Sequence, residues 1–205
     1  MEQTNIQHYT SALEGILAQE GERARGYSWI HNKCSEKFNR IYITLSIPSI
    51  ILSTIIGATS VGSNSLFGSG SNIANVVLGG LSIVVGIVNT LNGTFAFAKR
   101  SEGHRLVSQN YAKLFTFISI ELALSREERI PPSNFIKMIR EEMERLNEIA
   151  PPLDASVIKQ FNREFKQDYK DIAKPIETNG LAKISVFKTL PATPTLNEMS
   201  SGNQP

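Results

Sequence analysis

Small and polar residues recur along one face of an apolar segment near the middle of this chain of 205 residues. Their spacing alternates between four and three residues, which places them on one side of a helix. This small-residue stripe consists of Asn75, Gly79, Ser82, Gly86, Asn89, Gly93 and Ala96. Amide and hydroxyl groups on such a face can hydrogen-bond in an apolar medium, either to a neighbouring helix or to water.

Two interpretations of the stripe stay open. In the first, small residues let helices approach closely, and amides bond between the helices. In the second, the stripe lines a water-filled path, which needs several copies because two helices cannot enclose a channel. Asn89 and Asn92 are the strongest lining candidates, since two amides near one membrane level cost more to bury than glycines. A weaker stripe of the same kind precedes them: Ser46, Ser49, Ser53 and Ser60.

The element that carries both stripes is a segment without charge. From Ile41 to Ala98 the chain contains no Asp, Glu, Lys or Arg. A membrane-spanning helix needs about 20 residues, so this segment is long enough for two passes. Gly62–Asn72 is rich in Gly, Ser and Asn, which is typical of a turn. We therefore predict spans at 41–61 and 73–98 joined by a loop at 62–72, with a bend at Pro48. The alternative is a soluble protein with a buried helical hairpin.

Basic residues on both flanks predict the orientation of the hairpin. They are Arg23, Arg25, Lys33, Lys37 and Arg40 before the first span, and Lys99, Arg100, Arg105 and Lys113 after the second. Because basic residues are retained on the cytosolic side, both termini should be cytosolic and the loop should face the opposite compartment. The prediction is an integral, multi-pass membrane protein whose first partner is the lipid bilayer.

The polar parts of the chain predict helices on both sides of the hairpin. Residues 1–40 show apolar positions at helical spacing, which indicates an amphipathic helix, bent near Gly21 or Gly26, that leads directly into the first span. Residues 99–175 predict a cytosolic helical bundle, and the second span should continue as helix through Leu124. The fold class is thus an all-α membrane protein: a two-helix transmembrane hairpin with a cytosolic helical bundle.

Prolines and caps divide the predicted bundle. Pro131-Pro132 ends one helix, and Ser133 can cap the next, which stops at Pro151-Pro152. Asp154 can cap a third helix that extends through Ile172 and stops before Pro175. Residues 176–205 lack periodicity and are rich in Thr, Asn, Ser and Pro, which predicts a flexible tail.

Catalytic and cofactor chemistry is not indicated. The three histidines have no metal-ligand spacing, and Glu102 and His104, two apart, should point to different helix faces. The single cysteine, Cys34, lies on an apolar face and is expected in the core. Gly68–Ile73 lacks the lysine of a phosphate-binding loop. The net charge of +2, with acids alternating with bases, does not favour a nucleic-acid partner. We expect no enzyme activity, no cofactor and no metal.

The order of these segments resembles the SLATT family of two-transmembrane effectors. The resemblance covers about residues 20–174 and is carried by the span Ile41–Gly57 and by scattered positions of the predicted bundle. The family-matching bundle residues include Glu102, His104, Tyr111, Arg129 and Pro151. It implies an oligomeric protein that forms membrane pores in conflict systems, often under the control of a nucleotide signal.

Two other functions remain as alternatives. We expect no fused sensor domain, and this favours a structural or adaptor membrane protein, for example a virion or organelle anchor that binds a cytosolic partner through its bundle or tail. A membrane-shaping hairpin of the reticulon kind is the third hypothesis, although the full length of both predicted spans argues against it.

Overall fold

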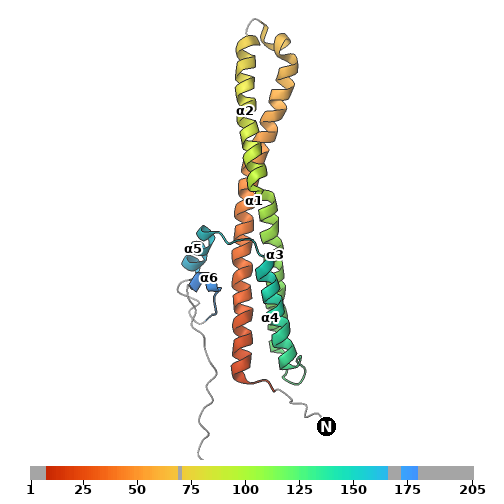
Figure 1. Ribbon diagram of the computed structural model, residues 1–205, viewed down its shortest axis with the longest axis vertical. Helices are drawn as coiled ribbons and strands as arrows, with labels where there is room; N and C mark the ends of the chain where they lie inside the picture. Colours follow the sequence, from red (N-terminus) through yellow and green to blue (C-terminus); the bar gives the residue numbers. More distant parts are fainter. Residues whose placement is uncertain (1–7, 69–70, 166–171, 180–205) are drawn as a thin grey trace, which may run out of the picture.

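The computed structural model describes residues 8–68, 71–165 and 172–179, and these residues fold almost entirely into helices (Figure 1). The helices in chain order are α1 (Ser11–Phe67), α2 (Ser71–Phe95), α3 (Phe97–Ala123), α4 (Pro132–Ile149), α5 (Ala155–Glu164) and α6 (Ile176–Asn179). The described part of the chain contains no strand. The all-helical class that the sequence predicts is confirmed.

Helix α1 is one continuous rod of 57 residues that passes through Gly21, Gly26 and Pro48 without interruption. At 1.5 Å per residue its length is about 85 Å. Its first part packs against α3, α4 and α5, and its last part pairs with α2 in a hairpin that projects away from the other helices (Figure 1). The expectation that the N-terminal helix leads directly into the first apolar segment is therefore confirmed.

The turn of the hairpin is shorter than the sequence predicts. Helix α1 continues to Phe67 and α2 begins at Ser71, whereas the Gly, Ser and Asn residues of the segment predict a loop at 62–72. Gly and Ser cost at most about 1 kcal/mol each inside a helix, so packing between α1 and α2 can extend both helices into this region. The turn itself begins at Gly68, whose positive φ of 48° is a conformation that glycine adopts easily.

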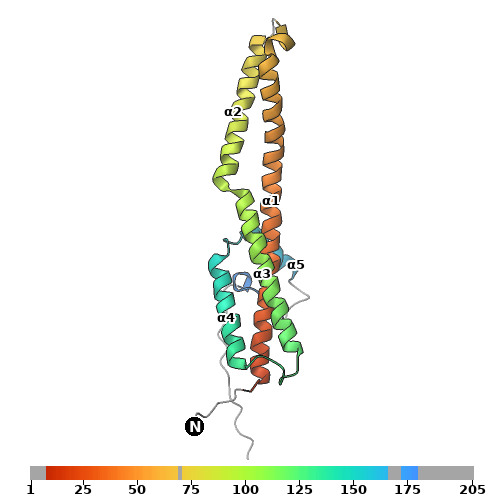
Figure 2. The same cartoon turned by 90° about the vertical axis from the view of Figure 1, so that its right-hand side faces the viewer.

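The second long helix is broken where the sequence predicts continuity through Leu124. Ala96 adopts a left-handed conformation with φ 47° and ψ 45°, so α2 ends at Phe95 and α3 begins at Phe97. The chain changes direction at this point (Figure 2). Backbone hydrogen bonds continue on both sides, because Ala96 N–H donates to Asn92 O and Arg100 N–H donates to Ala96 O. A left-handed alanine costs about 1–2 kcal/mol, which the packing of α3 on α1 must offset.

Helix α4 packs across the α1–α3 pair and closes the larger core. This core contains Leu17, Tyr111, Ile118, Phe135 and Leu146, all at most 2% exposed. The predicted N-cap at Ser133 is wrong: α4 begins at Pro132, with Pro131 in the cap position. Proline is favoured in the first helical turn because its missing N–H would have no partner there.

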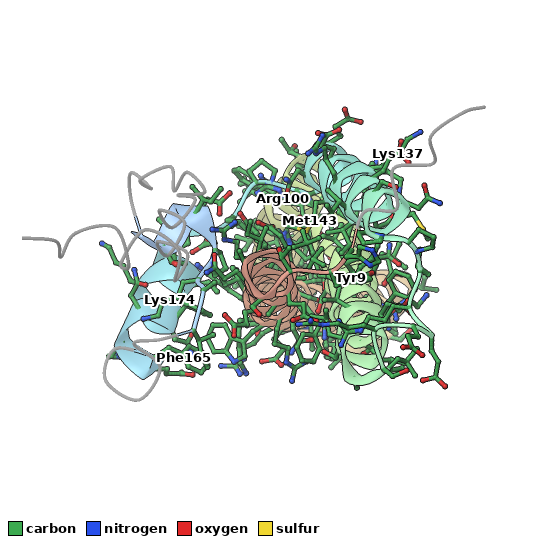
Figure 3. All side chains as sticks on the ribbon, turned by 90° about the horizontal axis from the view of Figure 1, so that it is seen from below. Tyr9, Arg100, Lys137, Met143, Phe165 and Lys174 are labelled. Atoms are coloured by element: carbon green, nitrogen blue, oxygen red, sulfur yellow. The ribbon has the colours of Figure 1, made fainter. Side chains whose placement is uncertain are left out.

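Helices α5 and α6 lie on a different side of α1 from α4, as the view along the long axis shows (Figure 3). The predicted cap of α5 is confirmed, since the Asp154 carboxylate accepts a hydrogen bond from Ser156 N–H at 2.8 Å. A second core joins α5 to α1 through Ile30, Cys34 and Phe161. Cys34 is fully buried, as expected.

The segment that the sequence assigns to the end of the third helix and to a flexible tail is partly folded. Helix α5 ends at Glu164 rather than near Ile172, and the predicted contribution of Tyr169 lies outside the described residues. The first residues of the predicted tail form α6, and the rest of the tail, 180–205, also lies outside the described residues. Pro175 is buried against Gly26 of α1.

We predict that Gly26→Ala releases this segment. A Cβ at Gly26 would lie 2.5 Å from Pro175 Cδ, so the proline must move or α6 must leave α1. Overpacking of this kind costs about 1–3 kcal/mol, and limited proteolysis should cleave the chain after Glu164 faster than in the wild type. Gly15→Ala is the matched control, because a Cβ there meets no atom within 4 Å. Equal cleavage rates in the two variants would contradict the prediction.

Candidate functional site: the helical hairpin

Helix α2 contacts α1 through a face that is mainly aliphatic. Its least exposed residues recur every three or four positions and are Ala74, Leu78, Leu81, Val85, Val88 and Asn92. The facing residues of α1 follow the same pattern and are Leu45, Ser49, Leu52, Ile56 and Thr59. This repeat is the knobs-into-holes spacing of an antiparallel helix pair.

The small-residue stripe lies one residue away from this contact face and is exposed. Its members in α2 are all exposed: Asn75, Gly79, Ser82, Gly86, Asn89 and Gly93. A Cβ added at Gly79, Gly86 or Gly93 would meet no atom within 4 Å. The packing of the hairpin on itself therefore does not use the glycines of the stripe.

Two hydrogen bonds join the amides of α2 to serines of α1. Ser49 Oγ donates to Asn89 Oδ1 at 2.6 Å, and Asn92 Nδ2 donates to Ser46 Oγ at 2.7 Å. The structure thus brings together the two amides and two of the serines that the sequence selects, in the manner of helix packing. Asn92 Oδ1 is buried and has no hydrogen-bond partner among the described residues. An unpaired buried acceptor of this kind costs about 1–3 kcal/mol.

Other hydroxyl groups of the hairpin bond to their own helix. Ser53 donates to Ser49 O at 2.7 Å, and Ser82 donates to Leu78 O at 2.9 Å. The same back-bonding satisfies Thr54, Thr59, Ser60 and Thr90. Hydroxyls bonded one turn back tolerate an apolar environment. In the stripe, Asn75 is exposed, and no hydrogen bond joins its amide to another described residue.

The apolar surface of the hairpin is not covered by the chain. Both helices are long and apolar enough to cross a membrane, and only 6% of the most apolar stretch of each is buried. Ile50 is 65% exposed, Val76 is 76% exposed and Ile83 is 66% exposed. A buried hairpin within one soluble chain would be covered on all sides, which is not the arrangement here.

The residues that carry the family resemblance lie in the bundle and do not form one site. Glu102 is exposed and pairs with Arg105 at 2.6 Å, which lowers the pKa of the carboxyl group. His104 points the opposite way, is 1% exposed and contacts His31, with 2.8 Å between the two Nδ1 atoms. The prediction that Glu102 and His104 occupy different faces is confirmed.

Tyr111, Arg129 and Pro151 each join helices at a separate place. The buried Tyr111 hydroxyl donates to Asn147 Oδ1 of α4 at 2.6 Å, and burial raises its pKa to about 12. Arg129 pairs with Glu14 of α1 at 2.5 Å. A Cβ added at Gly103 of α3 would lie 3.1 Å from Pro151 Cγ. Four of the five family-matching positions, His104, Tyr111, Arg129 and Pro151, thus take part in packing between segments of the bundle, whereas Glu102 pairs only within its own helix.

The His31–His104 contact is the feature that sequence reasoning missed. The two residues are 73 positions apart, so no local spacing reveals them. The available signal is that each sits on the buried face of a predicted amphipathic helix, as Ser28 and Ser108 do. Among the described residues, no three His, Cys, Asp or Glu side chains are grouped so that they could hold a metal ion.

Comparison with protein-family models, curated proteins and solved structures finds no match to this chain. The resemblance to the SLATT family stays a prediction, and the function has to be inferred from the geometry of the hairpin and the bundle.

Proposed function

We propose that this protein inserts its hairpin into a lipid bilayer, assembles with copies of itself through the small-residue stripe and forms a pore. The observation that carries the proposal is the exposed stripe: a Cβ at Gly79, Gly86 or Gly93 would meet no atom within 4 Å, and the amide of Asn75 is exposed. The basic flanks around Arg40 and Lys99 favour a cytosolic position for the bundle and both termini.

The polarity of the stripe argues for contact with protein or water. In a lipid bilayer an unpaired amide has no water to bond, so polar groups usually face other helices or a water-filled cavity. Glycines on one face let two helix backbones approach closely, and this is a common way for membrane helices to associate. The aliphatic residues on the remaining surface, such as Ile50 and Ile83, suit contact with lipid.

The chemistry of the stripe suits a water-filled path without strong charge selectivity. Its members offer amide, hydroxyl and backbone groups, and none of its residues carries a charge. Rings of charged side chains are what select cations or anions in many channels, so an uncharged lining should pass small ions of both signs. The resemblance to pore-forming two-transmembrane effectors supports the same proposal.

We predict that Gly86→Leu lowers dye leakage from liposomes that contain the purified protein by about tenfold or more, corresponding to about 1.4 kcal/mol of association free energy. The added side chain would occupy the stripe and keep neighbouring helices apart. Gly80→Leu is the matched control: it adds the same side chain to an exposed position of α2 outside the stripe, and a Cβ there also meets no atom within 4 Å.

Three results would count against the pore. One is the absence of leakage at every protein density, and the second is equal leakage from the Gly86→Leu and Gly80→Leu variants. The third is leakage unchanged by Asn89→Leu combined with Asn92→Leu, because this pair removes the two amides that bond to Ser49 and Ser46.

A structural or adaptor role is the second candidate, and a groove on the bundle favours it. The groove lies between α3 and α4, has a volume of about 600 Å³ and is lined by Leu114, Phe117 and Met138 with charged residues around them. An apolar floor with a charged rim is a common form of protein-binding surface. Recovery of a stoichiometric scaffold protein from membranes that show no leakage would favour this role over the pore.

A further inference from the structure

The interface between α1 and α3 contains a row of buried polar pairs. Ser28 lies opposite Ser108, His31 opposite His104, and Ser35 opposite Ser101. The serines of α3 bond to the backbone of α1: Ser108 Oγ donates to Ser28 O at 2.8 Å, and Ser101 Oγ donates to Ser35 O at 3.0 Å. The two imidazoles thus meet in the middle of a close contact between helices.

The histidine pair is shielded from solvent by aromatic rings. Each imidazole is 1% exposed, Tyr111 stacks on His31 with 5.8 Å between ring centroids, and Phe38 stacks on His104 at 5.5 Å. A charge on either ring would lose its hydration, which is costly in such surroundings.

The other ionisable groups around the pair come from four elements. They are Tyr27, Cys34 and Lys37 of α1, Arg100 and Tyr111 of α3, Asp154 before α5, and Glu177 of α6. Asp154 is already paired with Lys37 at 2.8 Å, and Arg100 lies over the Phe38 ring. No salt bridge in the described part of the chain joins a carboxylate to either imidazole, so a second positive charge on the pair would not be neutralised.

The hydrogen bond between the two Nδ1 atoms depends on how many protons the two imidazoles carry. In the neutral pair one Nδ1 carries a hydrogen and donates it to the lone pair of the other. One added proton can be placed on Nε2 of the donor ring, and the bond survives. When both rings are protonated, both Nδ1 atoms carry hydrogen, the acceptor is gone and two like charges lie in contact.

A break between two helices lies near this contact. Helix α1 is continuous from the bundle into the hairpin, whereas the return path is broken at Ala96, about two helical turns from His104. The left-handed conformation of Ala96 marks a place where the backbone already departs from the helix. A displacement of α3 relative to α1 can therefore occur there without unfolding α2.

We propose that the His31–His104 pair is a proton-sensitive latch: it holds α3 against α1 when neutral and releases α3 to move about Ala96 when both imidazoles are protonated. The movement is a property of the bundle alone. Its consequence for permeability, the opening or closing of a pore, rests on the function proposed above.

The acid-base properties of the pair agree with a latch that stays closed at neutral pH. Burial, followed by the nearby His104, lowers the pKa of His31 to about 4. The pKa of His104 is also lowered, first by burial and then by Arg100, while Asp154 opposes the change. Release should therefore need a pH below the ordinary range of histidine.

The test is a distance measurement in the full-length protein in liposomes. Spin labels on cysteines introduced at Asn32 of α1 and Gln109 of α3, both exposed, report the separation of the helices in a Cys34→Ala background. Lowering the pH from 8 to 4 should lengthen the distance reversibly by up to a helix diameter, about 10 Å. The change should be absent in His31→Gln and in His104→Gln, since neither can form a doubly charged pair.

The matched control is His8→Gln, which removes an exposed histidine that lies before α1 and should leave the movement unchanged. An unchanged distance in the wild type would overturn the latch, and so would the same movement in both glutamine variants. If one of these variants fails to pack at pH 8, the other supplies the comparison. Movement without liposome leakage would keep the latch and refute the pore, whereas acid-dependent leakage without movement would refute the latch.

Discussion

Arg129→Met will destabilise the end of the bundle by about 3 kcal/mol, although Arg129 lies in a loop far from the hairpin. Its side chain is 9% exposed and pairs with Glu14 of α1. It also donates to Leu122 O at 2.9 Å and to Leu124 O at 3.0 Å, and its guanidinium lies over the Tyr9 ring. Methionine can fill part of the volume, but it leaves two carbonyl groups without their charged donor.

Arg126→Met is the matched control for this prediction. Arg126 pairs with the same carboxylate at 2.7 Å but is 55% exposed, and water can replace it. The hydrogen bonds from Arg126 and then Arg129 lower the pKa of Glu14 to about 2, and Glu14 is ionised at neutral pH in both variants, because even its ordinary pKa of 4.5 lies well below 7. Only the loss of Arg129 removes the bonds to the two carbonyl groups.

Chemical denaturation in detergent, followed by circular dichroism, gives the stability of each variant, and hydrogen exchange locates the change. Faster exchange in the α3–α4 connection and at the start of α4 is expected for Arg129→Met alone. If both methionine variants lower the denaturation midpoint equally, the carbonyl bonds of Arg129 are not the cause.

The two apolar helices of the hairpin can be predicted from the sequence because the feature that indicates them, a long segment without charged residues, is a matter of composition. The absence of charge between Ile41 and Ala98 does not depend on how the helices pack, and the two long apolar helices follow from it. The cap at Asp154 is predicted for a similar reason: a carboxylate two residues before a free backbone N–H acts locally. Features that depend only on composition or on neighbouring residues can therefore be predicted without knowledge of tertiary contacts.

The ends of helices and the break at Ala96 depend on contacts that are distant in sequence. Alanine has the highest helix propensity, so nothing local predicts a left-handed conformation at Ala96. Serine and histidine pairs join α3 to α1 beside apolar contacts, whereas α2 meets α1 mainly through aliphatic residues such as Leu81 and Val85. Helices α2 and α3 thus meet α1 through side chains of different chemistry, and the break at Ala96 lies between the two interfaces.

The stripe shows how far residue types can identify a site. The sequence selects the face of α2 with small and polar residues, but the face that packs on α1 is the neighbouring one, around Val85. On a helix adjacent residues are about 100° apart, so a stripe and a contact face can both follow the same heptad spacing. Only the structure separates the glycines, which stay exposed, from Asn92, which bonds to Ser46.

Acid should weaken the bundle before any of its salt bridges are lost, because its two buried histidines are neutral in the folded state. The pKa of His31 falls from 6.5 in the unfolded chain to about 4 in the folded chain, so the unfolded state binds protons first. Stability is then complete above about pH 6.5 and declines as the pH falls toward 4. A difference of this size corresponds to about 3 kcal/mol, and His104 acts in the same direction.

The paired carboxylates Asp154 and Glu14 take up protons at lower pH than the histidines do. The loss of stability caused by the histidines can therefore be measured separately from the loss caused by the carboxylates. Hydrogen bonds from Lys37 and Ser156 lower the pKa of Asp154 to about 2, and the pKa of Glu14 is similar. Because their folded pKa values lie below the unfolded ones, their contribution is present above about pH 4.5 and is lost only below it.

Denaturation midpoints measured between pH 7.5 and 4.5 therefore report the histidines. In this window the wild type should lose stability steadily, His31→Gln should show a much flatter curve, and His8→Gln should follow the wild type. Parallel curves for the wild type and His31→Gln would show that the buried imidazole binds protons as readily as one in water, which is incompatible with its 1% exposure and its contact with His104.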